Sequence, residues 1–321
     1  MRRATLPVTP AAQLDQRAAA QAWLVDQLWG EEAVGILGGE PKCCKSLFAL
    51  HLALAVASGR PMLERYAVSA PGPVLFYAAE DAEHIVADRI RRIAAGAGVT
   101  LTNLPLAFIT TPTLRLDSQS DLDALDATVA QEKPRLLILD PFVRLHRKDE
   151  NQAGDIAPIL AALRAIQRQH HCAILVAHHA RKGGGNVRAG QALRGSSEFH
   201  AWGDCNCFLR WRQRELILSV EHRAAPPPDD LVLALRQNDN SLQIHIVDHA
   251  AAATATSTPV PTPAARILAC LQASPVPLTR EQLRQAVGMR NQTIGQVLND
   301  LCARRQIVRR DHGYHLNPVA A

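Results

Sequence analysis

Residues 34–50, VGILGGEPKCCKSLFAL, constrain the fold more than any other stretch of the chain. A short apolar run ends at Gly38-Gly39, small and polar residues follow, and Lys45-Ser46 lead into an apolar helical pattern. A strand that turns into a helix in this way directs backbone N–H groups toward a bound phosphate. The lysine adds a positive charge and the serine a hydroxyl ligand for Mg²⁺. The stretch predicts a phosphate-binding loop in an α/β protein.

The loop departs from the usual G-x-x-x-x-G-K-S/T spacing at one position. Gly39, Lys45 and Ser46 fit, but Cys44 replaces the second glycine. If that position needs a positive φ, the replacement costs about 1 kcal/mol or more. The alternative interpretation is a glycine-rich strand-to-helix turn with an incidental lysine. On the first interpretation, the residues that contact the nucleotide are Gly39, Glu40, Pro41, Lys42, Cys43, Cys44, Lys45, Ser46 and Leu47.

Length and composition allow one large domain and one small one. The chain has 321 residues, 47% of them hydrophobic, which supplies a core for both. The formal charge of +5 resides in residues 264–321, which hold eight arginines and three carboxylates, so we look there first for a nucleic-acid partner. Seven cysteines without CxxC pairs favour reduced core thiols in a cytoplasmic protein. The absence of an 18-residue apolar span predicts no membrane segment.

Two carboxylates follow predicted buried strands. Glu80 comes after VLFYAA, and Asp140 ends LLILD about ninety-five residues beyond the loop. In a parallel sheet, groups at the carboxyl ends of strands meet at one edge, where a ligand binds. The alternatives are an acidic pair that opens the next helix, which the helix dipole favours, and an aspartate that caps a strand before a proline turn. The order and spacing favour a site that joins Lys45, Glu80 and Asp140.

The remaining pattern predicts further elements around this sheet. We expect a helix over residues 11–29, an exposed and mobile charged loop over 143–155, and a strand that leads through His178-His179 into a Gly- and Arg-rich loop. A loop of that length in a compact domain is functional or disordered, and its basic residues suit phosphates. Four alternating segments from Cys205 onward predict antiparallel strands at one sheet edge.

The C-terminal part has a different character. Residues 250–263 are an uncharged Ala/Thr/Pro linker, and three short helices and two short strands follow. This order resembles a winged helix-turn-helix, whose third helix enters a major groove. The resemblance implies base contacts from Arg290, Asn291, Gln292, Thr293 and Gln296, and phosphate contacts from Arg304, Arg305, Arg309 and Arg310. The alternative is a winged helix used for protein contacts.

Taken in order, the strings GGEPKCCKS, YAAED, LLILDPF, ILVAHHARK and LRGSS resemble the RecA-like ATPases, and most closely the RepA-type hexameric replicative helicases. The resemblance spans about residues 30–245 and implies a mostly parallel sheet flanked by helices with antiparallel edge strands. The expected organisation is an N-terminal helical segment (1–30), the RecA-like ATPase domain (31–249), the linker (250–263) and the winged-helix domain (264–321).

The resemblance also implies roles for individual residues. Lys45 would bind the β- and γ-phosphates of ATP, Ser46 and Asp140 would hold Mg²⁺, and Glu80 would deprotonate the attacking water. His178 or His179 would sense the γ-phosphate. Arg194 and Arg210 are candidates for the arginine finger supplied to a neighbouring subunit, which implies a ring or filament of identical copies. Arg181, Lys182 and Arg188 would face DNA.

Three functions remain open at this point. The first is an ATP-driven replicative helicase of a plasmid or mobile element. The second is a regulator or loader that assembles on duplex DNA under the control of ATP without unwinding it, which a duplex-reading C-terminal domain fits at least as well. The third, a small-molecule kinase, is disfavoured because no acceptor-site lid is recognisable and the tail is basic.

Overall fold

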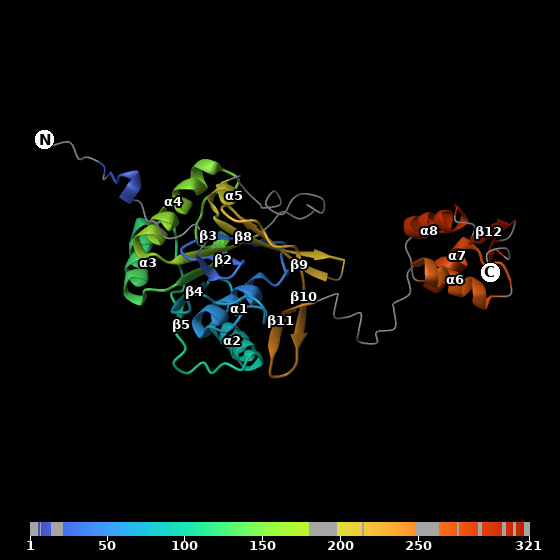
Figure 1. Ribbon diagram of the computed structural model, residues 1–321, viewed down its shortest axis with the longest axis horizontal. Coiled ribbons are helices and arrows are strands. Elements are labelled where there is room, and N and C mark those ends of the chain that lie inside the picture. The colour runs from blue at the N-terminus through green and yellow to red at the C-terminus, as the bar shows by residue number, and fades with distance from the viewer. Residues whose placement is uncertain are drawn as a thin grey trace. The chain divides into compact units, whose positions relative to one another are not determined.

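The computed structural model describes residues 6, 8–13, 22–179, 198–213, 215–247, 263–274, 276–287, 291–303, 306–310 and 313–317. The chain forms two compact units, Met1–Asp248 and His249–Ala321, each with its own core (Figure 1).

A nine-stranded mixed sheet is the centre of the first unit. Its order is β11-β10-β9-β8-β3-β7-β6-β4-β5. The strands from β8 to β5 run parallel, and β9, β10 and β11 continue from β8 as antiparallel strands. This confirms the predicted RecA-like sheet with antiparallel edge strands. The bounds are β3 (Val34–Gly39), β4 (Val74–Ala78), β5 (Leu106–Ile109), β6 (Leu136–Asp140), β7 (Ala173–His179), β8 (Cys205–Arg212), β9 (Glu215–His222), β10 (Leu231–Gln237) and β11 (Leu242–Ile246).

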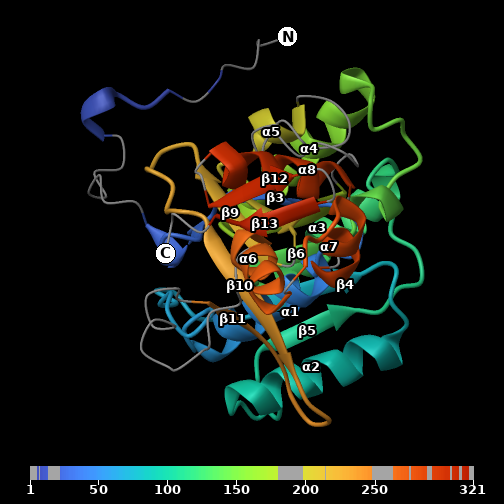
Figure 2. The same cartoon turned by 90° about the vertical axis from the view of Figure 1, so that its right-hand side faces the viewer.

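Helices cover both faces of the sheet (Figures 1 and 2). α1 (Lys45–Ser58) and α2 (Glu83–Ala97) share one core, and α3 (Gln119–Glu132), α4 (Ala153–His170) and α5 (Glu198–Trp202) share the other. Alternate strand residues enter alternate cores, so Leu136 and Ile138 face α1 while Leu137 and Leu139 face α4. A sheet buried on both faces explains why its strands read as continuous apolar runs.

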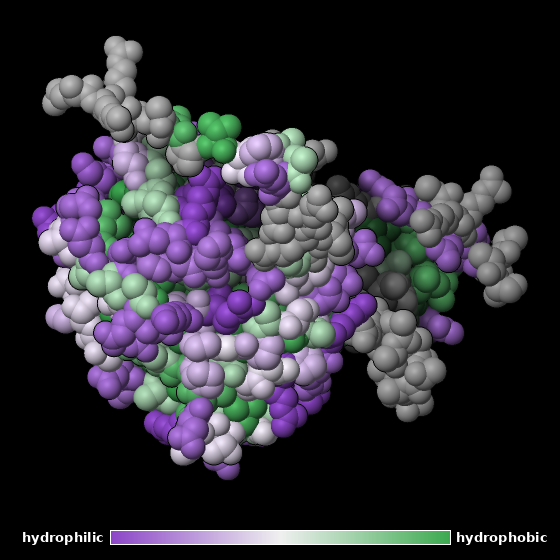
Figure 3. Space-filling model, turned by 60° about the vertical axis from the view of Figure 1, so that its left-hand side comes forward, coloured by the Kyte–Doolittle hydropathy of each residue, from purple (hydrophilic) through white to green (hydrophobic). Residues whose placement is uncertain are grey.

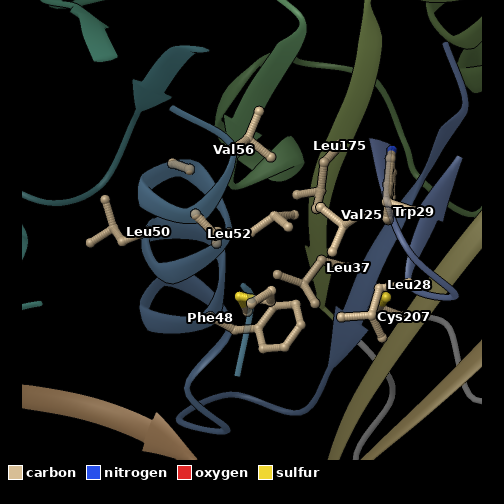
Figure 4. Close-up of a cluster of buried hydrophobic side chains, with 14 of the residues drawn as sticks. Val25, Leu28, Trp29, Leu37, Phe48, Leu50, Leu52, Val56, Leu175 and Cys207 are labelled. Carbon is tan, nitrogen blue, oxygen red and sulfur yellow. The ribbon is translucent and has the colours of Figure 1, made fainter. Parts of the chain in front are cut away.

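The α1 core fixes the helix that follows the phosphate-binding loop. Phe48, Leu52 and Val56 of α1 pack beside Leu37 of β3 and Leu175 of β7 (Figure 4). Phe48 is 1% exposed, and burial of a side chain of this size contributes about 2–3 kcal/mol. The N-terminus of α1 is therefore held against the carboxyl ends of the central strands.

The helix expected over residues 11–29 is wrong at both ends, and residues 14–21 lie outside the described residues. Described residues in this range form a short 3₁₀ turn (Ala11–Gln13) and a two-stranded hairpin, β1 (Trp23–Val25) and β2 (Trp29–Gly30). Gln27, with a φ of 54°, lies at its turn, and Val25 forms a bridge with Val68. The hairpin is held by this pairing with the segment after α1 and by burial of its apolar side chains. These contacts override the helical spacing that the sequence suggested.

The loop after β6 is also less exposed than expected. A 3₁₀ turn (Phe142–Arg144) follows β6, Leu145 and His146 are buried, and α4 begins at Ala153. The charged sequence of residues 143–155 predicted an exposed loop throughout, and this is wrong for these two side chains. Phe142 and His146 lie against one another, with ring centroids 4.5 Å apart.

The second unit contains three helices and a hairpin. They are α6 (Pro263–Ala273), α7 (Arg280–Val287), α8 (Asn291–Ala303), β12 (Ile307–Arg310) and β13 (Gly313–Leu316). Ile267, Leu283, Ile294 and Leu298 form its core with Ile307 of the hairpin. A backbone bridge between Leu278 and Tyr314 ties the hairpin to the segment before α7.

Hydrophobic side chains are mostly collected in these cores. The face of the molecule in Figure 3 is dominated by hydrophilic residues, with hydrophobic ones in small patches. All seven cysteines lie in described segments and none is in a disulfide. Within the described ranges, no helix combines the length and apolar character needed to cross a bilayer.

Candidate nucleotide site

The loop between β3 and α1 folds around the side chain of Lys45, the first residue of α1. The Lys45 Nζ donates hydrogen bonds to the carbonyl oxygens of Gly39 and Glu40, both at 2.9 Å, and the residue is 6% exposed. A Cβ on Gly39 would collide with the Leu209 carbonyl and the Cys43 sulfur, so only glycine fits at the start of the loop. Cys43 is buried, Pro41 and Lys42 are exposed, and Glu40 and Leu47 are partly exposed.

The substituted position has the backbone of a glycine. Cys44 has φ 63° and ψ 22°, in the left-handed region. Its carbonyl oxygen accepts a hydrogen bond from the backbone N–H of Phe48 in the first turn of α1. A side chain in this region costs about 1–2 kcal/mol. Burial raises the pKa of Cys43 to about 11 and also raises the pKa of Cys44, so both side chains are neutral thiols. The loop keeps its shape despite the cysteine.

Two substitutions at Cys44 test this backbone strain. We expect Cys44→Gly to keep the free energy of unfolding within about 1 kcal/mol of wild type, because relief of strain offsets the extra freedom of glycine in the unfolded chain. Cys44→Val should lower it by about 1–2 kcal/mol, because a β-branched residue tolerates this region poorly. Urea unfolding measures both; equal stabilities for the glycine and valine variants would contradict the left-handed geometry.

Ser46 and Asp140 meet at the base of the loop. The Ser46 hydroxyl donates a hydrogen bond to the Asp140 carboxylate, which is 6% exposed. Burial raises the pKa of Asp140 to about 6; the Ser46 hydrogen bond and the Lys45 charge oppose this rise, and Asp81 and Glu80 add to it. The structure therefore brings Lys45, Ser46 and Asp140 together, and Glu80 and Asp81 are near enough to raise the pKa of Asp140.

The two acidic residues after β4 have different partners. Ala79 donates its backbone N–H to the Asp140 carbonyl at 2.7 Å, which places residue 80 beside the end of β6. Glu80 is paired with Arg144, with Nε to Oε1 at 2.9 Å, and its side chain is 43% exposed. Asp81 is paired with Arg89 of α2. Glu80 thus lies at the open rim of the site, and Asp81 is tied to a helix.

The two histidines at the end of β7 face opposite sides of the sheet. Ile174, Val176 and His178 lie on the α4 side, where the His178 ring stacks on Phe199 with centroids 4.2 Å apart. His179 is one residue further on, pairs in register with Gly39, and is partly exposed. Strand alternation puts His179 on the face that carries α1 and the loop. The sequence left open which histidine faces the loop, and the strand geometry favours His179.

His178 belongs to a buried polar group that the sequence did not suggest. The Glu150 Oε1 lies 3.7 Å from His146 Nε2 and 3.7 Å from His178 Nδ1, and both histidine side chains are at most 1% exposed. His146 Nδ1 accepts the Lys148 N–H at 3.2 Å, and it is Nε2 that faces Glu150. Burial favours a higher pKa for Glu150, but His146, His178 and His179 together lower the pKa below its usual value. We call His146, Glu150 and His178 the glutamate bridge.

The remaining predicted residues have other partners or lie outside the described residues. Arg210 of β8 pairs with Asp230 at 2.7 Å, and the two side chains are 41% and 49% exposed. Arg309 is exposed on β12, with its guanidinium 6.0 Å from the centre of the Tyr314 ring. The structure does not describe Arg181, Lys182, Arg188, Arg194, Arg290, Arg304 or Arg305, nor the side chains of Asn291, Gln292, Thr293, Gln296 and Arg310.

The donor set suits a nucleotide with its magnesium ion. A hydroxyl and a carboxylate are the hard oxygen ligands that Mg²⁺ takes alongside phosphate oxygens and water. Ser46 and Asp140 would hold the ion, which would neutralise charge on the phosphates. The lysine amine, now on loop carbonyls, supplies the positive charge for the phosphates themselves.

A parallel sheet with this loop, serine and aspartate at its carboxyl edge defines a RecA-like P-loop ATPase. Residues 1–185 match the AAA domain family AAA_25, and the chain belongs to that family.

Two solved structures are similar to the chain. A DnaB-like replicative helicase, solved in a study of its interactions with primase, shares 12% identity at a TM-score of 0.52. The similarity covers 66% of this chain and 57% of the helicase chain. A KaiC-like protein from Pyrococcus horikoshii shares 14% identity at a TM-score of 0.48, over 70% of this chain and 94% of its own. The helicase comparison supports the RecA-like fold.

Sequence reasoning missed several residues around the site. Arg144, His146 and Glu150 come from a segment that reads as exposed and charged, and only the i, i+4 spacing of His146 and Glu150 hints at a shared face. Trp211 lies beside the loop and was not singled out. Its alternation with Cys207 and Leu209 in β8 is the signal that could have placed it on the α1 face.

Proposed function

We propose that this protein is a DNA-dependent ATPase that hydrolyses ATP between subunits and acts on DNA as a RepA-like replicative helicase of a plasmid or mobile element. The observation that carries the proposal is the meeting of Lys45, Ser46 and Asp140 at the carboxyl edge of the sheet, with Glu80 at the rim. Those are the groups that hydrolysis of a nucleotide requires.

The side chains divide the reaction among them. Lys45 moves from its loop carbonyls to the β- and γ-phosphates, and Ser46 and Asp140 hold the ion. Glu80 leaves Arg144 to orient and deprotonate a water molecule, which its exposed position at the rim favours. His179 monitors the γ-phosphate, because the β7 register places it next to Gly39. Its movement would pass to the segment that follows β7.

The working form is a ring or filament of identical copies. The Arg210 side chain is 41% exposed and, among the described residues, pairs with an exposed aspartate, so exchange of that partner for a neighbour's phosphate costs little. Arg194 is the second candidate. An arginine supplied across a subunit boundary stabilises charge in the transition state, so an isolated copy would turn over slowly.

DNA is the proposed partner, and a cytoplasmic location fits the reduced thiols. The basic second unit, with Arg309 exposed on its hairpin, would act as a winged helix that contacts DNA. This unit favours a second candidate function, an ATP-dependent regulator or loader that assembles on duplex DNA. A duplex-reading module is not needed for movement along one strand.

Strand separation distinguishes the two functions. The full chain is incubated with a forked duplex that carries a fluorophore and a quencher, with ATP or a non-hydrolysable analogue and Mg²⁺. ATP-dependent separation supports the helicase. An ATP-dependent mobility shift of intact duplex without separation supports the regulator. Hydrolysis that neither single- nor double-stranded DNA stimulates would contradict both, and Lys45→Ala is the inactive control.

A further inference from the structure

Trp211 extends the candidate site on the side away from the carboxylates. Leu209 of β8 pairs with Gly39 of β3, and Asn206 Oδ1 accepts the Ile36 N–H at 3.0 Å, so the register of β8 on β3 is fixed. Trp211 is two residues beyond Leu209 and passes the end of β3. Its indole Nε1 donates to the Lys42 carbonyl oxygen of the loop at 3.3 Å.

The ring lies on the loop face and is open to solvent. Cys205, Cys207 and Leu209 face the α1 core, and Trp211 continues the same alternation. It is 46% exposed, and it is the only aromatic residue among the large exposed hydrophobic residues in the described part of the chain. An indole fixed by its N–H, with much of its surface in water, is suited to stack against a flat ligand.

The order of the strands sets the direction of a nucleotide in this site. The groups assigned to Mg²⁺ and to the attacking water, Asp140 and Glu80, follow β6 and β4 on one side of β3, and β8 is on the other side. A triphosphate with its γ end at the carboxylates places its nucleoside toward β8. We infer that the Trp211 indole stacks on the purine base of the bound nucleotide; this inference rests on the proposed ATPase function.

Stacking of this kind defines a class of ligand. An indole offers no hydrogen bonds to the edge of a base, so it selects ring size and tolerates either purine. ATP and GTP should bind with similar affinity, and CTP and UTP more weakly. The phosphate contacts, which come from the loop, are common to all four.

The test compares ATP with inorganic tripolyphosphate, which has the phosphates and no base. Calorimetric titrations use the full chain with Mg²⁺. We expect Trp211→Ala to weaken ATP binding about tenfold and to leave tripolyphosphate binding unchanged. Trp211→Phe, which keeps an aromatic face and loses the bond to Lys42, should bind ATP within about threefold of wild type. Leu235→Ala, at an exposed residue of β10 two strands away, is the matched control and should change neither ligand.

The outcomes separate this inference from the proposed function. Unchanged ATP binding by a folded Trp211→Ala variant overturns the stacking role, and so does an equal loss for both ligands, which would mean that the ring shapes the loop. If Trp211→Ala fails to fold, a Trp211→Phe affinity within threefold together with a preference for purines supports the inference, and equal binding of all four nucleotides overturns it. If wild type binds neither ATP nor tripolyphosphate, the ATPase proposal itself fails.

Discussion

Lys45→Ala is expected to lower ATP turnover by at least about 100-fold. The variant lacks the positive charge that stabilises the negative charge developing on the phosphates in the transition state of hydrolysis. The lysine is buried and donates two 2.9 Å hydrogen bonds to its own loop, so its amine is already held within the loop. Steady-state phosphate release with saturating Mg²⁺ and ATP measures the effect.

Lys133→Ala is the matched control for that loss. Lys133 carries the same charge, is exposed, and follows α3 on the face of the sheet opposite α1. Its removal should leave turnover within about threefold, because an exposed charge is largely screened by solvent. Comparable activities for the two alanine variants would show that the loop does not bind the phosphates.

Glu80→Gln is expected to reduce turnover by about 10²–10⁴-fold and to leave ATP affinity nearly unchanged, because an amide keeps the shape of the carboxylate and cannot accept the proton of water. Glu80 lies at the rim beside the end of β6 and is bound only by an exposed arginine, Arg144, as far as the described contacts show. Single-turnover hydrolysis separates the chemical step from nucleotide binding.

Asp81→Asn provides the comparison within the same acidic pair. Asp81 is bound to Arg89 and borders a cavity of about 380 Å³ between α2 and β5, so its side chain is directed toward the helix. Its replacement should lower stability slightly and turnover by less than about tenfold, since an ion pair at this exposure contributes at most about 1 kcal/mol. A larger loss of turnover for Asp81→Asn than for Glu80→Gln would reverse the assignment of the base.

The sheet and the loop were predictable because strong local signals agreed. Runs such as Leu136–Leu139 are apolar on both faces, as a covered parallel sheet requires, and Asp140 follows the run directly. The meeting of Lys45, Ser46 and Asp140 follows from the shared direction of β3 and β6. The loop spacing raised a positive φ at position 44 only as a condition, and the structure shows it, with a φ of 63° at Cys44.

Other features depend on contacts between distant segments. The β1–β2 hairpin forms because Val25 pairs with Val68, which no local pattern near Trp23 reveals. His178 and His179 are adjacent in a strand and so face opposite sides, and only the packing of β7 in the sheet shows which of them faces the loop. The burial of His146 needs Phe142 and Glu150 in place around it.

The glutamate bridge connects the segment after β6 with the end of β7. The Glu150 carboxylate, whose side chain is 13% exposed, lies near His146 from the first segment and His178 from the second. If either histidine withdraws, a carboxylate with little access to solvent loses one of the histidines that lower its pKa, which is costly in a medium of low polarity. We therefore expect a displacement of one segment to displace the other, so that the chain moves together where it leaves β6 and β7.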